Sequence, residues 1–277
     1  MTSIIAIGDS LAFGVGESRI ASPCGAWAGR LAQVIGAPHP LRFAWPGARI
    51  ADVVNLQLDA ALMRRPAIAL ISVGGNDAIR WGFDAPAFQA RLHDAIDALE
   101  RGAAKVVVLN LPDVARQSPV PPLIRRRLHE RILRLNEAIG LATHGTNALV
   151  VDRWHDPAAY ERAYLSSDRV HPSPLGYQRL AERTAKALGY EGVPSPVDVS
   201  HHDARRRLWL VTSGLPWAVK RSPQLVPGIA SLILNESGRI RHPERHHRKA
   251  DGQRCQDDDI NALAANHEPA GLSVRQQ

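Results

Sequence analysis

The chain has 277 residues, of which 45% are hydrophobic and 22% are charged, and its length allows one or two domains. This composition is ordinary for a soluble globular protein and excludes collagen-like, coiled-coil and wholly disordered chains. The formal net charge of +7 raises nucleic acid or an acidic membrane as a hypothetical partner, depending on where the basic residues lie.

Short apolar runs alternate with helical patterns over the first 190 residues. The runs typical of buried strands lie at residues 3–8, 67–73, 105–111 and 148–152, with a weaker candidate at 41–44. Their nearly continuous apolar character predicts burial on both faces, as in a parallel sheet.

Helical patterns fall between these runs. Helices are predicted at 85–100 and 175–188, and a further helix is indicated by an apolar stripe made of Leu128, Ile132, Leu135 and Ile139. Pro121 and Pro122 precede that stripe, and Gly140 and Gly145 lie near its end. The alternation of strands and helices predicts a three-layer α/β/α sandwich with a mainly parallel, five-stranded sheet.

The composition changes after Tyr190, so residues 1–190 are expected to form one folded domain. Residues 191–204 contain prolines without a helical or strand period and are interpreted as a linker. Residues 205–234 regain apolar and basic character and are expected to form a short helical segment. Residues 235–277 are polar, and we expect this tail to be disordered.

Four short segments within 1–190 carry side chains that can do chemistry. They are Gly8-Asp9-Ser10-Leu11, Gly47 in its turn, Gly74-Gly75-Asn76-Asp77 and Asp168-Arg169-Val170-His171-Pro172. The first three follow predicted strands, and ligand sites of open α/β sheets form beyond the carboxyl ends of the strands. Together the segments supply a hydroxyl, an imidazole, a carboxylate, a side-chain amide and glycine backbone donors, which suits acyl transfer through a serine.

The order of these segments resembles the SGNH, or GDSL-type, hydrolase family. That family carries four signature blocks, and GDSL, a lone glycine, GGND and DxxHP occur here in the same order with similar spacing. The resemblance covers residues 1 to about 190 and implies the flavodoxin-like SGNH hydrolase fold, followed by a C-terminal extension. The G-x-S-x-G elbow of α/β-hydrolases is absent from the sequence, which disfavours that alternative fold.

The resemblance assigns a role to each matching residue. It implies that Ser10 is the nucleophile, His171 the general base and Asp168 the carboxylate that orients His171. The implied oxyanion hole consists of the Ser10 N–H, the Gly47 N–H and the Asn76 side chain. Trp45 stands where the family often has asparagine, two residues before the glycine of the second block. The resemblance implies neither a metal nor a cofactor.

Each of these residues also has a structural interpretation. Ser10 could cap the helix after the first strand, and Asp9 is better explained as a residue that shapes the loop by backbone hydrogen bonds. Asn76-Asp77 would ordinarily form a turn; we keep Asn76 as functional and interpret Asp77 as structural. The loops 14–22 and 80–86 are candidate walls for the acyl or leaving group.

The basic residues lie mostly outside the four segments. Residues 205–249 hold ten Lys or Arg and only two Asp or Glu, so the charge does not indicate a nucleic-acid partner for the domain. Residues 205–234 could associate weakly with a membrane surface, but three prolines prevent one long amphipathic helix there. We favour packing of this segment against the domain.

The expected cellular location follows from the absence of targeting patterns and from the small number of cysteines. The N-terminus has neither the basic region nor the apolar region of a signal peptide, and the two cysteines suit a reducing compartment. No apolar run approaches the ~20 residues that span a bilayer. We therefore expect a cytoplasmic protein.

The sequence as a whole predicts a serine hydrolase that cleaves carboxylic esters or thioesters through an acyl-serine intermediate. The expected partner is a small-molecule, lipid or carbohydrate acyl ester. Two alternatives stay open: an acyltransferase that uses the same site, and a binding module without catalysis on the same fold.

Overall fold

The computed structural model describes residues 2–17, 26–80, 82–102, 104–117 and 120–191. The predicted linker at 191–204, the helical segment at 205–234 and the tail at 235–277 lie outside the described residues, apart from Glu191. So do residues 18–22 of the first candidate wall loop and Trp81 of the second.

A five-stranded parallel sheet forms the middle layer, in the order β2-β1-β3-β4-β5. Its strands are β1 (Ile4–Gly8), β2 (Leu41–Arg42), β3 (Ile68–Ser72), β4 (Lys105–Leu109) and β5 (Leu149–Val151). Every residue of β1 and β3 is buried, as their continuous apolar runs predict. The weak candidate at 41–44 contributes only two residues, at the edge of the sheet.

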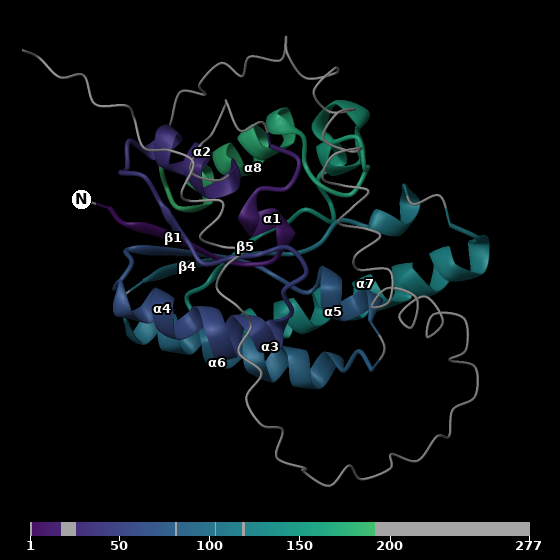
Figure 1. Cartoon of the computed structure of the whole chain (residues 1–277), viewed down its shortest axis with the longest axis horizontal. Coiled ribbons are helices and arrows are strands. Elements are labelled where there is room, and N and C mark those ends of the chain that lie inside the picture. Colours follow the sequence, from purple (N-terminus) through teal and green to yellow (C-terminus); the bar gives the residue numbers. More distant parts are fainter. Residues whose placement is uncertain (1, 18–25, 81, 103, 118–119, 192–277) are drawn as a thin grey trace, which may run out of the picture. The chain divides into compact units, whose positions relative to one another are not determined.

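Helices cover both faces of the sheet, so the predicted three-layer α/β/α sandwich is confirmed (Figure 1). One face packs against α1 (Ser10–Phe13), α2 (Ala26–Ile35) and α8 (Pro174–Ala187). The other face packs against α3 (Ile50–Asp52), α4 (Leu58–Met63), α5 (Gly75–Ile79), α6 (Ala85–Arg101) and α7 (Pro122–Thr143). Short 3-10 helices occupy Val114–Arg116, Pro157–Tyr160 and Arg162–Tyr164.

Helix α7 contains the four residues of the apolar stripe and confirms the helix that the stripe predicts. Leu128, Ile132, Leu135 and Ile139 are all buried, as expected for one face of an amphipathic helix. The helix begins at Pro122, a position that tolerates proline because the first N–H groups have no helical acceptor. It continues through Gly140 to Thr143, because burial of Ala142 on the same face outweighs the ~1 kcal/mol cost of a glycine.

The run from Ile50 to Met63 is helical, which the sequence does not predict, and it contains an irregular turn. Between α3 and α4 lies a π-helix, Val53–Gln57, which turns the fully buried Gln57 toward the end of β1. The Gly8 N–H donates to Gln57 Oε1 at 2.6 Å, and Gln57 Nε2 donates to the Gly8 carbonyl at 3.0 Å. One side chain thus holds both backbone polar groups of the last residue of β1.

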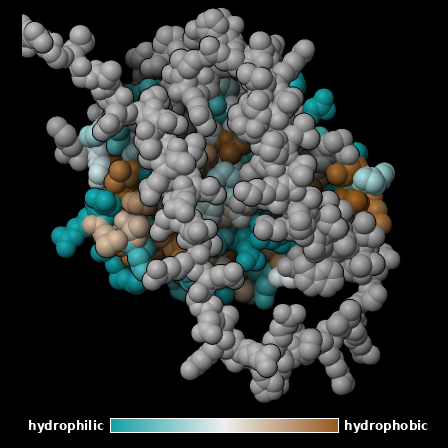
Figure 2. All heavy atoms as spheres, viewed as in Figure 1, coloured by the Kyte–Doolittle hydropathy of each residue, from teal (hydrophilic) through white to brown (hydrophobic). Residues whose placement is uncertain are grey.

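The structure contains no helix long and apolar enough to cross a membrane among the residues it describes. On the face drawn in Figure 2, hydrophilic and hydrophobic side chains are mixed over the described surface.

We expect Gln57→Leu to lower the free energy of unfolding by about 2–4 kcal/mol, because it leaves the buried Gly8 N–H without an acceptor and removes one donor from the Gly8 carbonyl. Urea unfolding measures the change. Gln33→Leu, at an exposed position of α2, is the control and should stay within ~0.5 kcal/mol of wild type. Equal effects of the two substitutions would contradict a role for Gln57 in holding β1.

Candidate active site

The predicted site residues meet at the edge of the sheet where the strands end. Ser10 is the first residue of α1, directly after β1, and Asn76 lies in α5, shortly after β3. Gly47 lies in the turn after β2, and His171 lies in the loop that leads into α8. Parallel strands bring these loops together, which is why residues so distant in sequence share one edge.

Ser10, His171 and Asp168 form one hydrogen-bonded series. His171 Nε2 lies 2.8 Å from Ser10 Oγ, and His171 Nδ1 lies 2.6 Å from Asp168 Oδ2. The imidazole is 15% exposed and the carboxylate 23%, so both are largely shielded from water while remaining reachable. The structure therefore brings together the three side chains that the sequence analysis selected.

Asp168 is held as a carboxylate by several donors. Its Oδ1 accepts from Ser166 Oγ at 2.7 Å, from the Val170 N–H at 2.9 Å and from the His171 N–H at 3.0 Å. Burial alone would raise its pKa, but the hydrogen bond and charge of His171 and these backbone bonds hold the pKa well below its usual value. Asp168 is thus ionised beside the imidazole at neutral pH.

The backbone before Ser10 is fixed from the sheet. The Asp9 N–H donates to the Ser72 carbonyl of β3 at 2.8 Å, and Asp9 Oδ1 accepts from the Leu11 N–H at 3.1 Å. Asp9 is therefore the N-cap of α1, which is the loop-shaping role expected for it, and the alternative of Ser10 as the cap is wrong. Burial raises the pKa of Asp9 to about 6.

The turn that contains Gly47 is tied to the same place. The Trp45 N–H donates to the Gly8 carbonyl at 3.3 Å, and Asn76 Nδ2 donates to the Ala48 carbonyl at 3.0 Å. Gly47 is buried with a φ of 87°, a conformation that favours glycine. The structure thus places Gly47 and Asn76 on one hydrogen-bonded unit that contacts the end of β1.

Asp77 links α5 to α3, in keeping with its structural interpretation. Its two carboxyl oxygens lie 3.3 Å and 3.2 Å from the Ile50 nitrogen, which donates to them. Burial is the main influence and raises the pKa of Asp77 to about 7. The cluster of Asp9 and Asp77 near Ser10 therefore contains two carboxyls whose charged forms burial disfavours.

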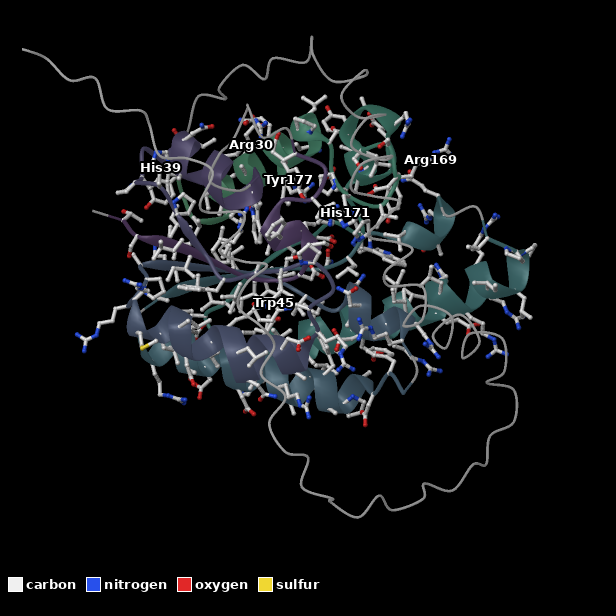
Figure 3. All side chains as sticks on the ribbon, in the orientation of Figure 1. Arg30, His39, Trp45, Arg169, His171 and Tyr177 are labelled. Atoms are coloured by element: carbon white, nitrogen blue, oxygen red, sulfur yellow. The ribbon has the colours of Figure 1, made fainter. Side chains whose placement is uncertain are left out.

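Several supporting residues carry no motif and were missed by the sequence analysis. The Tyr177 hydroxyl donates to the Val15 carbonyl at 2.8 Å and lies 3.3 Å from the Leu11 carbonyl, so α8 holds the loop that carries Ser10. Arg30 of α2 pairs with Glu17 at 2.7 Å and donates to Gln178 at 3.1 Å. Figure 3 shows Tyr177 between Arg30 and His171. In sequence, Tyr177 reads as an ordinary core residue.

Within the described part of the chain, the structure contains no group of three or more His, Cys, Asp or Glu side chains that could hold a metal ion.

Comparison with known proteins gives the family and the fold. The family model of GDSL-like lipases and acylhydrolases matches residues 6–179. A protein of the G-D-S-L family from Desulfitobacterium hafniense DCB-2, described as lipolytic, matches with a TM-score of 0.54 and 21% identity over 68% of this chain and 100% of its own. No curated protein matches the chain.

Two esterase structures also match this chain, with similar TM-scores, identities and coverage. The acetylxylan esterase Axe2 from Geobacillus stearothermophilus has a TM-score of 0.54 and 19% identity over 70% of this chain and 97% of its own. The psychrotrophic esterase EstA from Pseudoalteromonas has a TM-score of 0.53 and 17% identity over 68% and 97%. At these identities, the likeness to the solved structures shows the fold.

The raised pKa of Asp77 predicts a pH dependence of stability. Since the folded chain binds this proton more tightly than the unfolded chain, the contribution is full below about pH 4 and is lost as the pH rises through about 7. We expect Asp77→Asn to remove that loss, so that wild type loses stability relative to the variant by at most ~1.4 kcal/mol per pH unit over this window. Urea unfolding from pH 4 to 8 measures it.

The control is Asp59→Asn, an exposed carboxyl on α4. Its stability should follow the wild-type pH profile. Parallel profiles for wild type and Asp77→Asn would show that Asp77 titrates alike in the folded and unfolded chain, contrary to the prediction.

Proposed function

We propose that this chain, which belongs to the GDSL-like lipase/acylhydrolase family, cleaves carboxylic esters or thioesters through an acyl-serine intermediate formed at Ser10. The observation that carries the proposal is the hydrogen-bonded series from Asp168 through His171 to Ser10. A serine hydroxyl is a weak nucleophile at neutral pH, and an adjacent imidazole is the base that activates it.

In the proposed acylation, His171 Nε2 takes the Ser10 proton while Oγ attacks the carbonyl carbon of the ester. The tetrahedral intermediate then collapses, and the protonated His171 gives its proton to the leaving alcohol or thiol. In deacylation, His171 takes a proton from water, the hydroxide attacks the acyl carbon, and Ser10 regains the proton as the acid leaves.

Asp168 acts on the imidazole. By accepting from Nδ1–H it fixes the tautomer in which Nε2 is free to accept a proton, and it stabilises the imidazolium that forms. The depressed pKa of Asp168 supports this role, because the carboxylate stays charged at neutral pH.

The oxyanion is proposed to bind the Ser10 N–H, the Gly47 N–H and one N–H of Asn76. Neither the Ser10 nor the Gly47 N–H donates to a described residue, so both are open to a substrate oxygen. Asn76 Nδ2 uses one hydrogen on Ala48 and retains a second, and the bond to Ala48 fixes the amide plane. Donors held in place before the reaction stabilise developing charge most effectively.

The substrate is proposed to be an acyl ester of a small molecule, a lipid or a carbohydrate. Proteins of similar fold include an acetylxylan esterase and one described as lipolytic, which supports a carbohydrate or lipid ester as the substrate. Gly14 and Gly16, which both have positive φ, and Phe83 belong to the candidate wall loops and are within the described residues.

We expect wild type to hydrolyse p-nitrophenyl esters and Ser10→Ala to lose at least about a thousandfold in kcat across the acyl-chain series, because the nucleophile is removed. Initial rates of p-nitrophenol release measure it. A fluorophosphonate probe should label wild type and Ser3→Ala, whose serine precedes β1 at the opposite edge of the sheet, but not Ser10→Ala. Equal labelling of Ser10→Ala would refute the assignment of the nucleophile.

We expect Asn76→Ala to lower kcat by about a hundred- to a thousandfold with a small change in KM, because it removes a donor that acts on the transition state. Steady-state kinetics with a short p-nitrophenyl ester separates the two constants. Asn147→Ala, an exposed position just before β5, is the control and should keep wild-type kinetics. A loss confined to KM would place Asn76 in ground-state binding instead.

A further inference from the structure

Arg153 is a buried cation for which the proposed reaction has no use. It lies two residues beyond β5, at the same edge of the sheet as Ser10, and the residue is only 8% exposed. Its guanidinium donates no hydrogen bond and makes no ion pair with any residue in the described ranges. A charge withdrawn from water without a partner is costly, so such a group calls for an explanation.

The acidic groups near Arg153 already have partners. Asp156 binds Arg179 at 2.8 Å and Arg183 at 3.0 Å, so two other guanidinium groups balance its charge. Asp9 interacts electrostatically with Arg153, but its Oδ1 accepts from the Leu11 N–H and lies 3.4 Å from Ser72 Oγ. Neither carboxylate forms an ion pair with Arg153.

The phenols near Arg153 cannot balance its charge either. The Tyr177 hydroxyl donates to the loop after Ser10, and burial raises its pKa well above the usual value, so it is neutral. The Tyr160 hydroxyl donates to the Trp154 carbonyl and accepts from the Asp113 N–H. Among the residues that the structure describes, the guanidinium therefore has neighbours that attract it, but none that binds it.

The backbone that carries Arg153 is fixed. Asn110 Oδ1 accepts from the N–H groups of Arg153 and Trp154, while Asn110 Nδ2 donates to Asp152 at 2.7 Å. The Asp152 carbonyl in turn accepts from Arg183 at 2.8 Å. A fixed backbone at Arg153 means that only the side chain has to be ordered when a ligand binds, which lowers the entropic cost of binding.

Two of the groups that interact electrostatically with Arg153 lie next to the nucleophile loop. Asp9 immediately precedes Ser10, and the hydroxyl of Tyr177 binds the loop that follows it. The guanidinium thus lies within electrostatic range of the Ser10 loop, at the edge of the sheet where β5 ends. A planar cation with several donors is well suited to bind a carboxylate.

We propose that Arg153 is a substrate-binding residue that recognises a carboxylate carried by the ester, so that the preferred substrates are anionic acyl esters. The proposal rests on the proposed esterase function and deepens it by naming the substrate class. It gives this guanidinium, which has no partner among the described residues, a partner that is present only when substrate is bound.

The test uses pairs of esters in which one member carries a free carboxylate and the other carries its methyl ester. One pair, para-acetoxybenzoate and its methyl ester, carries the carboxylate on the leaving group. The other pair, mono-p-nitrophenyl adipate and its methyl ester, carries it on the acyl group. We expect wild type to prefer the anionic member of at least one pair by about tenfold or more in kcat/KM, as a charge-assisted bond predicts.

Arg153→Met should abolish that preference, mainly through KM, and Arg153→Lys should retain part of it. Arg101→Met removes the same charge from an exposed residue at the end of α6, near the opposite edge of the sheet, and should keep the preference. Absence of a preference in wild type for either pair, or its persistence in Arg153→Met, would overturn the proposal.

Turnover of the neutral esters and fluorophosphonate labelling of Ser10 separate this proposal from the proposed function. If wild type turns over neutral esters but ignores charge, only the role of Arg153 fails. If neither ester of a pair is cleaved and Ser10 is not labelled, the esterase function itself fails. Labelling of Arg153→Met at the wild-type level shows that the variant is folded, so that a lost preference reports on substrate binding.

Discussion

The closeness of β1 to β3 at Gly8 is the constraint on which the site depends. Gly8 has a φ of 131°, and a Cβ there would lie 1.9 Å from the Ser72 carbonyl oxygen. With no side chain in the way, Gln57 and the turn after β2 bind its backbone from the other side. The backbone of Gly8 is therefore fixed on both sides, and Ser10 follows it two residues later.

The second half of the site is held by α8. The Ser173 hydroxyl accepts from the Gly176 N–H and donates to the Ala163 carbonyl at 2.7 Å, which fixes the loop containing His171 at the start of this helix. One turn later, Tyr177 binds the loop after Ser10. A single helix thus sets both His171 and the nucleophile loop, so the 2.8 Å distance between them depends on packing in one layer.

A feature of this fold can be predicted from the sequence where it depends on a local pattern, and is missed where it depends on a contact between distant residues. Local apolar patterns predict the buried strands and α7. The motif residues lie together because parallel strands end at one edge of the sheet. Gln57 and Tyr177 escape detection because their partners are backbone atoms 49 and 162 residues away, which no local pattern encodes. Arg153 escapes for a related reason: in sequence it follows a strand like any surface arginine, and only the fold reveals that it is buried.

Burial acts on every carboxyl at this edge of the sheet, and the number of hydrogen-bond donors around each one decides whether its pKa rises or falls. Asp9, Asp77 and Asp168 are all withdrawn from water, and burial raises the pKa of each. Asp168 alone gathers four donors, from Ser166, Val170 and His171, and its pKa falls. The polar groups of the loop 166–171 thus bind one carboxylate and keep it charged beside the imidazole. The carboxyls next to Ser10 and Asn76, Asp9 and Asp77, have fewer donors, so burial raises their pKa and they bind a proton more readily than Asp168 does.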